Sequence, residues 1–270
     1  MQAAYLAAID WTAPWLAPYR ELGQMLAASV NWRDELNRLA RLADIRNFQG
    51  LPLQFIAQEG LPEGVPYEAH IGLTGEVPTR ENLHDFFNGL VWLHFPRTKA
   101  RLNQLQFEQL HHRATSAGSS QYRVGNARGK LRDAATIFDE NAALLLTRKR
   151  SLTQLLRQHQ WSEVFVDRRE EFRSDCTVLL FGHALMEKLV APYAAICAHC
   201  FALDLPAAGQ AVEPTLSDAD SLCASTLDDT LGTGDFFPVP VLGFPGWWSD
   251  QSAEFYSNAA VFRPKRTSAA

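Results

Sequence analysis

Residues 79–99 read TRENLHDFFNGLVWLHFPRTK, and this stretch carries the clearest folding signal in the chain. Its apolar residues recur at intervals of three and four, which predicts an amphipathic helix that starts at Thr79 and ends before Pro96. Thr79 is the predicted N-cap residue. A second helix is predicted over residues 98–112, and the two helices are expected to form a hairpin.

Polar side chains follow one edge of the apolar face of the first helix. At 100° per residue, Arg80, His84 and Asn88 lie on a single ridge, with Asp85 one step further round. Core packing explains the apolar residues but not this line of polar ones. His84 is a candidate general base or metal ligand, because neutral imidazole offers a lone pair near physiological pH. The alternative is a structural histidine bonded to a backbone carbonyl.

A second candidate pair lies in residues 182–188, GHALMEK, which follow a strand predicted over residues 176–181. His183 lies near the start of a helix predicted over residues 184–191, and Glu187 lies one turn later on the same face. The two side chains can act together at the end of a strand, which is a favoured place for ligands in α/β proteins. A local hydrogen bond between them is the alternative.

Residues 132–141, RDAATIFDEN, hold a third group of charged side chains. The pattern predicts strands over residues 134–138 and 142–147, joined by a turn at residues 139–141. The alternative is that the adjacent carboxylates in this segment bind a cation or share a proton together with other acids. Arg132 and Asp133 connect a basic loop, residues 114–132, to the first of these strands. They are therefore candidates for binding a ligand.

The rest of the chain alternates helical segments with glycine- and proline-rich ones. Residues 1–58 are predicted to be helical, with Asn31 as the N-cap of a helix over residues 31–48. A turn-rich segment with one short strand near residues 67–73 follows. Further helices are predicted over residues 151–159, 161–169 and 217–231, with Ser217 as a cap, and an extended proline-aromatic strap is predicted over residues 236–264.

These elements predict a single mixed α+β domain, helix-rich, with a small sheet. Residues 1–58 form an N-terminal helical extension in this prediction, and residues 59–270 form the main domain.

Composition and charge exclude several classes of protein. The chain has 270 residues, 47% of them hydrophobic, with 25 Lys and Arg against 30 Asp and Glu and a formal net charge of −5. These values are typical of a globular protein, and the net negative charge argues against extensive binding of duplex DNA. The basic residues between 97 and 132 remain sufficient to hold one small anion.

The apolar runs and the cysteines indicate the compartment. No run approaches the ~20 residues that a membrane helix needs, and the first residues lack the basic start of a secretory signal. Four cysteines are too few for a disulfide scaffold, so a cytoplasmic location is predicted. Cys197 and Cys200 form a CxxC motif in an apolar segment, which favours buried thiols over a redox or zinc site.

Four segments occur in a characteristic order: residues 79–99, residues 132–141, residues 182–188 and PVPVLGFPGW at residues 238–247. Together they resemble the bacterial domain-of-unknown-function family 3025, and the resemblance covers residues 67–266. It implies no reaction, substrate or catalytic residue. It does imply that the four segments belong to one site.

The first functional hypothesis is an acid/base or metal-assisted hydrolase that acts on a small anionic, phosphate-containing substrate. The predicted catalytic residues are His84, Asp85, His183 and Glu187, and the predicted substrate-binding residues are Arg80, Asn88, Lys99, Arg132 and Asp133. A divalent metal ion is compatible with this set, but the spacing does not specify its ligands. The alternatives are a noncatalytic module that binds a ligand, protein or nucleic acid, and a purely structural role. The oligomeric state is not specified.

Overall fold

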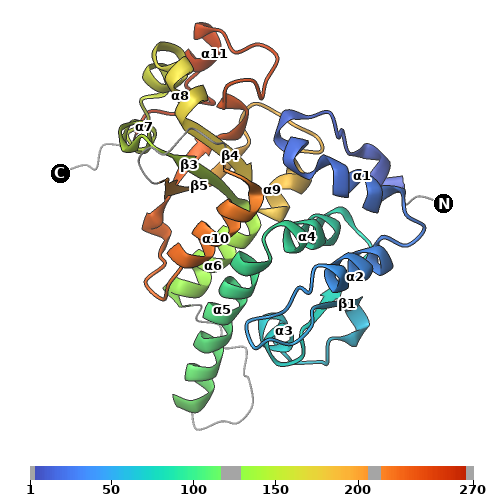
Figure 1. Ribbon diagram of the computed structural model, residues 1–270. Coiled ribbons are helices and arrows are strands. Elements are labelled where there is room, and N and C mark those ends of the chain that lie inside the picture. Colours follow the sequence, from blue (N-terminus) through green and yellow to red (C-terminus); the bar gives the residue numbers. More distant parts are fainter. Residues whose placement is uncertain (1–3, 117–128, 206–213, 266–270) are drawn as a thin grey trace.

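A four-stranded sheet is built on β3 (Ala142–Thr147), whose six residues are all buried. β3 pairs antiparallel with β4 (Cys176–Leu180) and parallel with β5 (Cys197–Asp204), and β5 pairs antiparallel with β6 (Phe236–Pro240). The strand order is therefore β4-β3-β5-β6. The computed structural model describes residues 4–116, 129–205 and 214–265, and helices surround this sheet (Figure 1).

The alternation of side chains along β3 divides the core between the two faces of the sheet. Leu144 and Leu146 contact one hydrophobic cluster, and Leu145 contacts another. The second cluster includes Phe237, Phe244 and other residues of the C-terminal segment. The structural role predicted for the strap over residues 236–264 is therefore confirmed.

A smaller sheet consists of β1 (Gln54–Ala57) and β2 (Glu76–Thr79), which run parallel. Their connection contains α3 (Tyr67–Thr74), where the sequence predicted a strand near residues 67–73. That prediction is wrong. The helix starts directly after Pro66 and ends at Gly75, whose φ of 77° is the left-handed cap that a glycine adopts readily.

Two long helices follow the small sheet. α4 (Leu83–His94) begins one turn later than predicted, because the Asn82 side chain, and not Thr79, caps it by accepting from the N–H of Asp85. Phe95 alone separates α4 from α5 (Pro96–Ser116), and Pro96 opens the second helix. Figure 1 shows α5 running away from the end of α4 along the side of the molecule.

Residues 130–141 form the helix α6 (Lys130–Asn141), although the sequence pattern predicted a strand over residues 134–138 followed by a turn. Leu131, Ala134, Ala135 and Phe138 are the buried residues of α6, and their spacing of three and four is helical. The FDEN segment is the last turn of this helix and leads directly into β3. The basic loop predicted over residues 114–132 falls partly on residues 117–128, which lie outside the described residues.

The N-terminal segment packs into the same hydrophobic cluster as α4. It contains the 3₁₀ helices η1 (Ala4–Ala8) and η2 (Pro14–Tyr19), then α1 (Arg20–Ala28) and α2 (Trp32–Leu42). Asn31 caps α2 as predicted, but the helix ends at Leu42 and not at residue 48. β1 belongs to the segment predicted as helical and pairs with β2 beyond residue 58. The proposed division at residue 58 stays a prediction.

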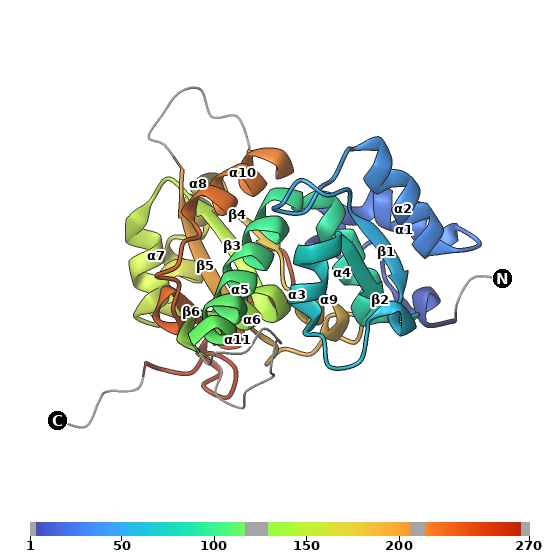
Figure 2. The same cartoon turned by 90° about the horizontal axis from the view of Figure 1, so that it is seen from below.

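The remaining helices cover the sheet and its ends, as Figure 2 shows from a second direction. α9 (His183–Lys188) follows β4 as predicted, and Thr215, not Ser217, caps the helix after β5. The other helices are η3 (Gln58–Gly60), α7 (Arg150–Arg157), the π-helical η4 (Glu163–Asp167), α8 (Arg169–Asp175), α10 (Leu216–Thr226), η5 (Thr233–Asp235), η6 (Val241–Gly243) and α11 (Ala253–Ser257). The fold is a helix-rich α+β fold.

The two CxxC cysteines lie on opposite faces of β5, because residues three apart in a strand point in opposite directions. Cys200 is buried and Cys197 is exposed, so the prediction of buried thiols holds for Cys200 alone. None of the helices in the described ranges is long and apolar enough to span a membrane.

Gly182 connects β4 to α9 at a point where the chain touches the end of α6. A Cβ atom at this position would lie 2.5 Å from the backbone nitrogens of Asn141 and Ala142. Only a residue without a side chain fits here while the two backbones stay this close.

We therefore expect Gly182→Ala to lower the free energy of unfolding by about 1–3 kcal/mol, the usual effect of overpacking. Gly234→Ala is the matched control, because a Cβ at Gly234 meets nothing within 4 Å. Urea unfolding of both variants tests this expectation. Equal midpoints for Gly182→Ala and the wild type would show that the contact is not restrictive.

Candidate functional site

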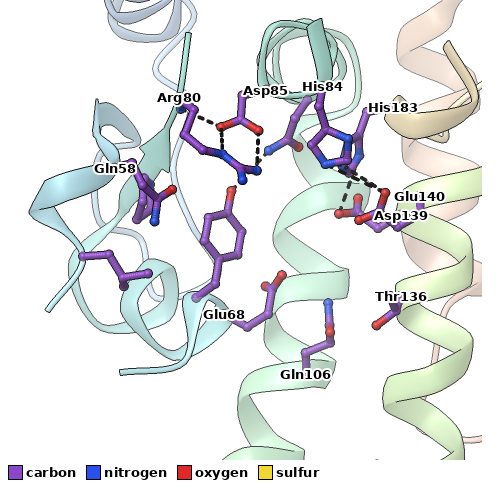
Figure 3. Close-up of a pocket in the computed structure, with 14 residues that line it drawn as sticks. Gln58, Glu68, Arg80, His84, Asp85, Gln106, Thr136, Asp139, Glu140 and His183 are labelled. Atoms are coloured by element: carbon purple, nitrogen blue, oxygen red, sulfur yellow. Dashed lines mark hydrogen bonds and ion pairs between the residues drawn. The ribbon is translucent and has the colours of Figure 1, made fainter. Parts of the chain in front are cut away.

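Two histidines that are distant in the sequence, one on α4 and one on α9, have side chains that face each other. His84 lies in the first turn of α4, and His183 is the first residue of α9. Their Nε2 atoms are 3.0 Å apart, and the ring centroids are 4.4 Å apart with an interplanar angle of 77°. Figure 3 shows the two rings side by side at one end of a cavity.

Two glutamates flank the histidines from different helices. Glu140, in the last turn of α6, places Oε2 3.6 Å from His183 Nε2 and 3.9 Å from His84 Nε2. Burial and the neighbouring Asp139 charge raise the pKa of Glu140, against the opposing effect of His84. Glu187 of α9 accepts a hydrogen bond from Nδ1 of His84 at 3.1 Å. Glu187 thereby fixes the orientation of the His84 ring.

His183 is almost fully buried, with 3% of its surface exposed. Burial lowers its pKa to about 4, although the nearby Asp139 carboxylate favours the protonated ring. The imidazole is therefore neutral near pH 7. Its Nδ1 lies 3.9 Å from Oδ2 of Asp139 and makes no hydrogen bond of ordinary geometry within the described part of the chain.

A buried lysine forms hydrogen bonds to two polar side chains next to this cluster. Lys99 donates hydrogen bonds from Nζ to Oδ1 of Asp139 at 2.5 Å and to Oδ1 of Asn88 at 2.8 Å. Asn88 in turn donates to the hydroxyl of Tyr67 at 3.2 Å. Burial opposes the charge on Asp139, but Lys99 and the two nearby histidines together outweigh it, so the pKa of Asp139 lies below its usual value.

The histidines open into a cavity of about 310 Å³ that is lined by polar side chains. Arg80 lies at its edge, where Asp85 accepts from the Arg80 backbone N–H at 2.6 Å and from Nε and Nη2 at 3.1 Å each. The described residues that line the cavity are Gln58, Leu61, Tyr67, Glu68, Pro78, Arg80, His84, Asp85, Asn88, Gln106, Thr136, Asp139, Glu140 and His183.

The structure brings together most of the residues that the sequence singled out. Arg80, His84, Asp85, Asn88 and His183 all line the cavity. Within this group, Asp85 contacts Arg80 and not a histidine.

Four further predicted residues have other positions. Glu187 bonds to His84 and not to His183, so the local i,i+4 hydrogen bond is not formed. Lys99 is not among the described residues that line the cavity and forms an ion pair with Asp139. Arg132 and Asp133 lie in the first turn of α6, away from the Asp139 and Glu140 end of the helix, and neither lines the cavity.

The predicted site does not include two carboxylates of the cluster, Asp139 and Glu140. The sequence favours a turn over a cation site for this segment, because DEN between apolar segments is typical turn chemistry. The helical spacing of Leu131, Ala134, Ala135 and Phe138 was the signal that could have placed them at the end of a helix.

Three side chains of this cluster can hold a metal ion. The ligand atoms of His84, Glu140 and His183 all lie within 4.8 Å of one another. A tetrahedral ion with bonds of about 2.0–2.1 Å separates its ligand atoms by roughly 3.3–3.4 Å. The observed separations of 3.0, 3.6 and 3.9 Å bracket this value.

The fold and the site define a helix-rich α+β protein with a histidine–carboxylate cluster in a polar cavity. Residues 53–266 match the family model described as "Protein of unknown function (DUF3025)", and the chain belongs to this family. No curated protein and no solved structure matches the chain.

The Lys99–Asp139 pair gives a prediction for stability. Lys99→Met leaves the Asp139 carboxylate buried without its ammonium partner, which typically costs about 3–5 kcal/mol. We expect a loss of this size in urea unfolding, and a partial recovery in the double variant Lys99→Met with Asp139→Asn. Arg38→Ala, which breaks an exposed pair with Glu35, is the control and should leave the midpoint unchanged. A wild-type midpoint for Lys99→Met would contradict the prediction.

Proposed function

We propose that this protein is a metal-dependent hydrolase that acts on a small anionic substrate. The observation that carries the proposal is the approach of His84 Nε2 and His183 Nε2 to 3.0 Å, with the Glu140 carboxylate facing both atoms. Two imidazoles and one carboxylate are the protein ligands of many hydrolytic zinc sites.

The protonation of the two rings supports a cation between them. Glu187 accepts from Nδ1 of His84, so that nitrogen carries the proton and Nε2 presents a lone pair. Both the carboxylate and the backbone of Asp139 favour a proton on the His183 ring, whose Nδ1 faces Asp139. In the tautomer with a proton on Nδ1 of His183, two lone pairs face each other at 3.0 Å, and a shared cation would remove this repulsion; in the other tautomer, Nε2–H of His183 donates to Nε2 of His84.

The surrounding residues would orient the ligands. Glu187 holds the His84 ring, and Asp139, fixed by Lys99, faces the His183 ring. Carboxylates in these positions set the tautomer and raise the basicity of a ligating imidazole. In this arrangement the histidines hold the ion and do not serve as the general base.

A divalent ion supplies Lewis-acid polarisation of the substrate and activation of a water molecule at neutral pH. The chain supplies binding and orientation. Arg80 is the single Arg or Lys side chain among the described residues that line the cavity, and Asp85 fixes its position through Nε and Nη2. Arg80 would therefore bind the anionic group of the substrate.

Metal binding is the first test. We expect the EDTA-treated protein to bind one Zn²⁺ per chain in a competition titration with a chromophoric chelator. His84→Ala, His183→Ala and Glu140→Gln should each weaken binding at least ~100-fold, and Glu187→Gln, which perturbs only the orientation of His84, by about 10–100-fold. His159→Ala, a histidine bonded to the Arg263 carbonyl far from the cluster, is the control. Unchanged zinc affinity in the three ligand variants would refute the metal site.

Turnover is the second test. Zinc-loaded protein should hydrolyse members of a panel of small anionic phosphate and carboxylate esters, and Glu140→Gln should abolish this activity. Arg80→Met should raise KM for anionic esters with little effect on neutral ones, because it removes the contact to the anion alone. Zinc binding without turnover would instead support the noncatalytic binding module. Preferred binding of Fe²⁺ with consumption of O₂ would also contradict the hydrolase, since the same ligand set suits non-haem iron.

A further inference from the structure

Two polar side chains at the inner end of the cavity take no part in the histidine cluster. Glu68 of α3 and Gln106 of α5 both line the cavity. Figure 3 shows them together on the side away from Arg80, which lies at the other end. In this view Arg80 and the histidines lie on one side and Glu68 and Gln106 on the other, so a substrate bound between Arg80 and the histidines that extends away from both would meet Glu68 and Gln106 (Figure 3).

Gln106 is a buried carboxamide without a hydrogen-bond partner. Only 6% of its surface is exposed, and its side chain makes no hydrogen bond with any described residue. Its polar atoms are not among the fully buried unpaired side-chain atoms of the described residues, so the carboxamide is accessible from the cavity. Because Gln106 faces the cavity, a ligand in the cavity can satisfy both its N–H donors and its carbonyl.

Glu68 is fixed in place beside Gln106. Asn103 donates from Nδ2 to Oε2 of Glu68 at 2.6 Å and to the Glu68 backbone carbonyl at 2.9 Å. Burial and the nearby charge of Asp139 raise the pKa of Glu68, against the opposing effects of Asn103, Lys99 and Arg132. Glu68 offers a hydrogen-bond acceptor in either protonation state, and the protonated acid also donates one, as a carboxamide does.

We propose that Glu68 and Gln106 form a specificity pocket that binds a neutral carboxamide group at the end of the substrate opposite its anionic group. This inference rests on the proposed function only in one respect: the proposed metal site defines which part of the substrate reacts. A carboxamide offers one acceptor and two donors, so it can pair with both side chains at once. The charges of Asp139, Lys99 and Arg132 all act on Glu68, so this part of the cavity is near groups of both signs and suits a neutral ligand group.

The test uses four probes that share an anionic carboxylate and an acetylated nitrogen and differ at the far end. They are N-acetyl-L-glutamine, N-acetyl-L-glutamate, N-acetyl-L-norleucine and Nα-acetyl-L-lysine. Calorimetric titration of the zinc-loaded full chain should give at least ~10-fold tighter binding of N-acetyl-L-glutamine than of the other three, because a site built for hydrogen bonds rejects analogues that leave it unpaired.

Variants identify the residues responsible. Gln106→Leu and Glu68→Leu should remove the preference, whereas Glu68→Gln should keep it, because a carboxamide also donates and accepts. Gln104→Leu is the matched control on the same helix, since Gln104 bonds to Arg101 and Glu108 instead of facing the cavity. All of these variants should retain the zinc affinity of the wild type.

The outcomes separate this inference from the metal site. Equal binding of the four probes, a preference for the lysine or glutamate probe, no binding of the glutamine probe, or a preference that survives in Gln106→Leu would each overturn it while zinc binding stands. If the wild type binds no zinc, the proposed function fails, and the same titrations on the metal-free chain still test the specificity pocket.

Discussion

The carbonyl oxygen of Ala142 accepts hydrogen bonds from the N–H groups of both Phe181 and Gly182, at 3.0 and 2.9 Å. This pair of bonds holds the end of β4 against the start of β3, so α9 begins beside the last turn of α6. His183 and Glu140 are neighbours for this reason, although 43 positions separate them in the numbering of the sequence. The absence of a side chain at Gly182 permits the approach.

Packing of α4 against α9 completes the cluster. The apolar face of α4 is buried, which leaves His84 at the border of that face, where it meets His183 and Glu187. Each carboxylate then has a distinct partner: Asp85 holds Arg80, Asp139 holds Lys99, and Glu187 holds His84. Glu140 faces both imidazoles and has no such cationic lysine or arginine partner among the ion pairs of the described residues. This difference is why the metal-binding proposal assigns the ligand role to Glu140.

The sequence was most informative where local periodicity and polar border residues coincide. The helix that carries His84, the strand–glycine–helix sequence before His183 and the α+β class follow from spacing alone. The FDEN segment was read wrongly because turn chemistry and a helix C-terminus use the same residue types. No local pattern could predict that Glu187 would bond to His84 instead of His183, because the nearest helical neighbour is the default partner. Glu68 and Gln106 carry no signal either, since their importance comes from the cavity that surrounds them.

The position of Asp139 and Glu140 in the last turn of α6 has an electrostatic consequence. The exposed carbonyl groups at the C-terminus of a helix carry partial negative charge, so acidic side chains there weaken the helix end by about 0.3–1 kcal/mol. Lys99 offsets this for Asp139 through a direct ion pair, and its charge also favours the ionised form of Glu140. A cation held by His84, His183 and Glu140 would offset the remaining negative charge and strengthen the end of α6.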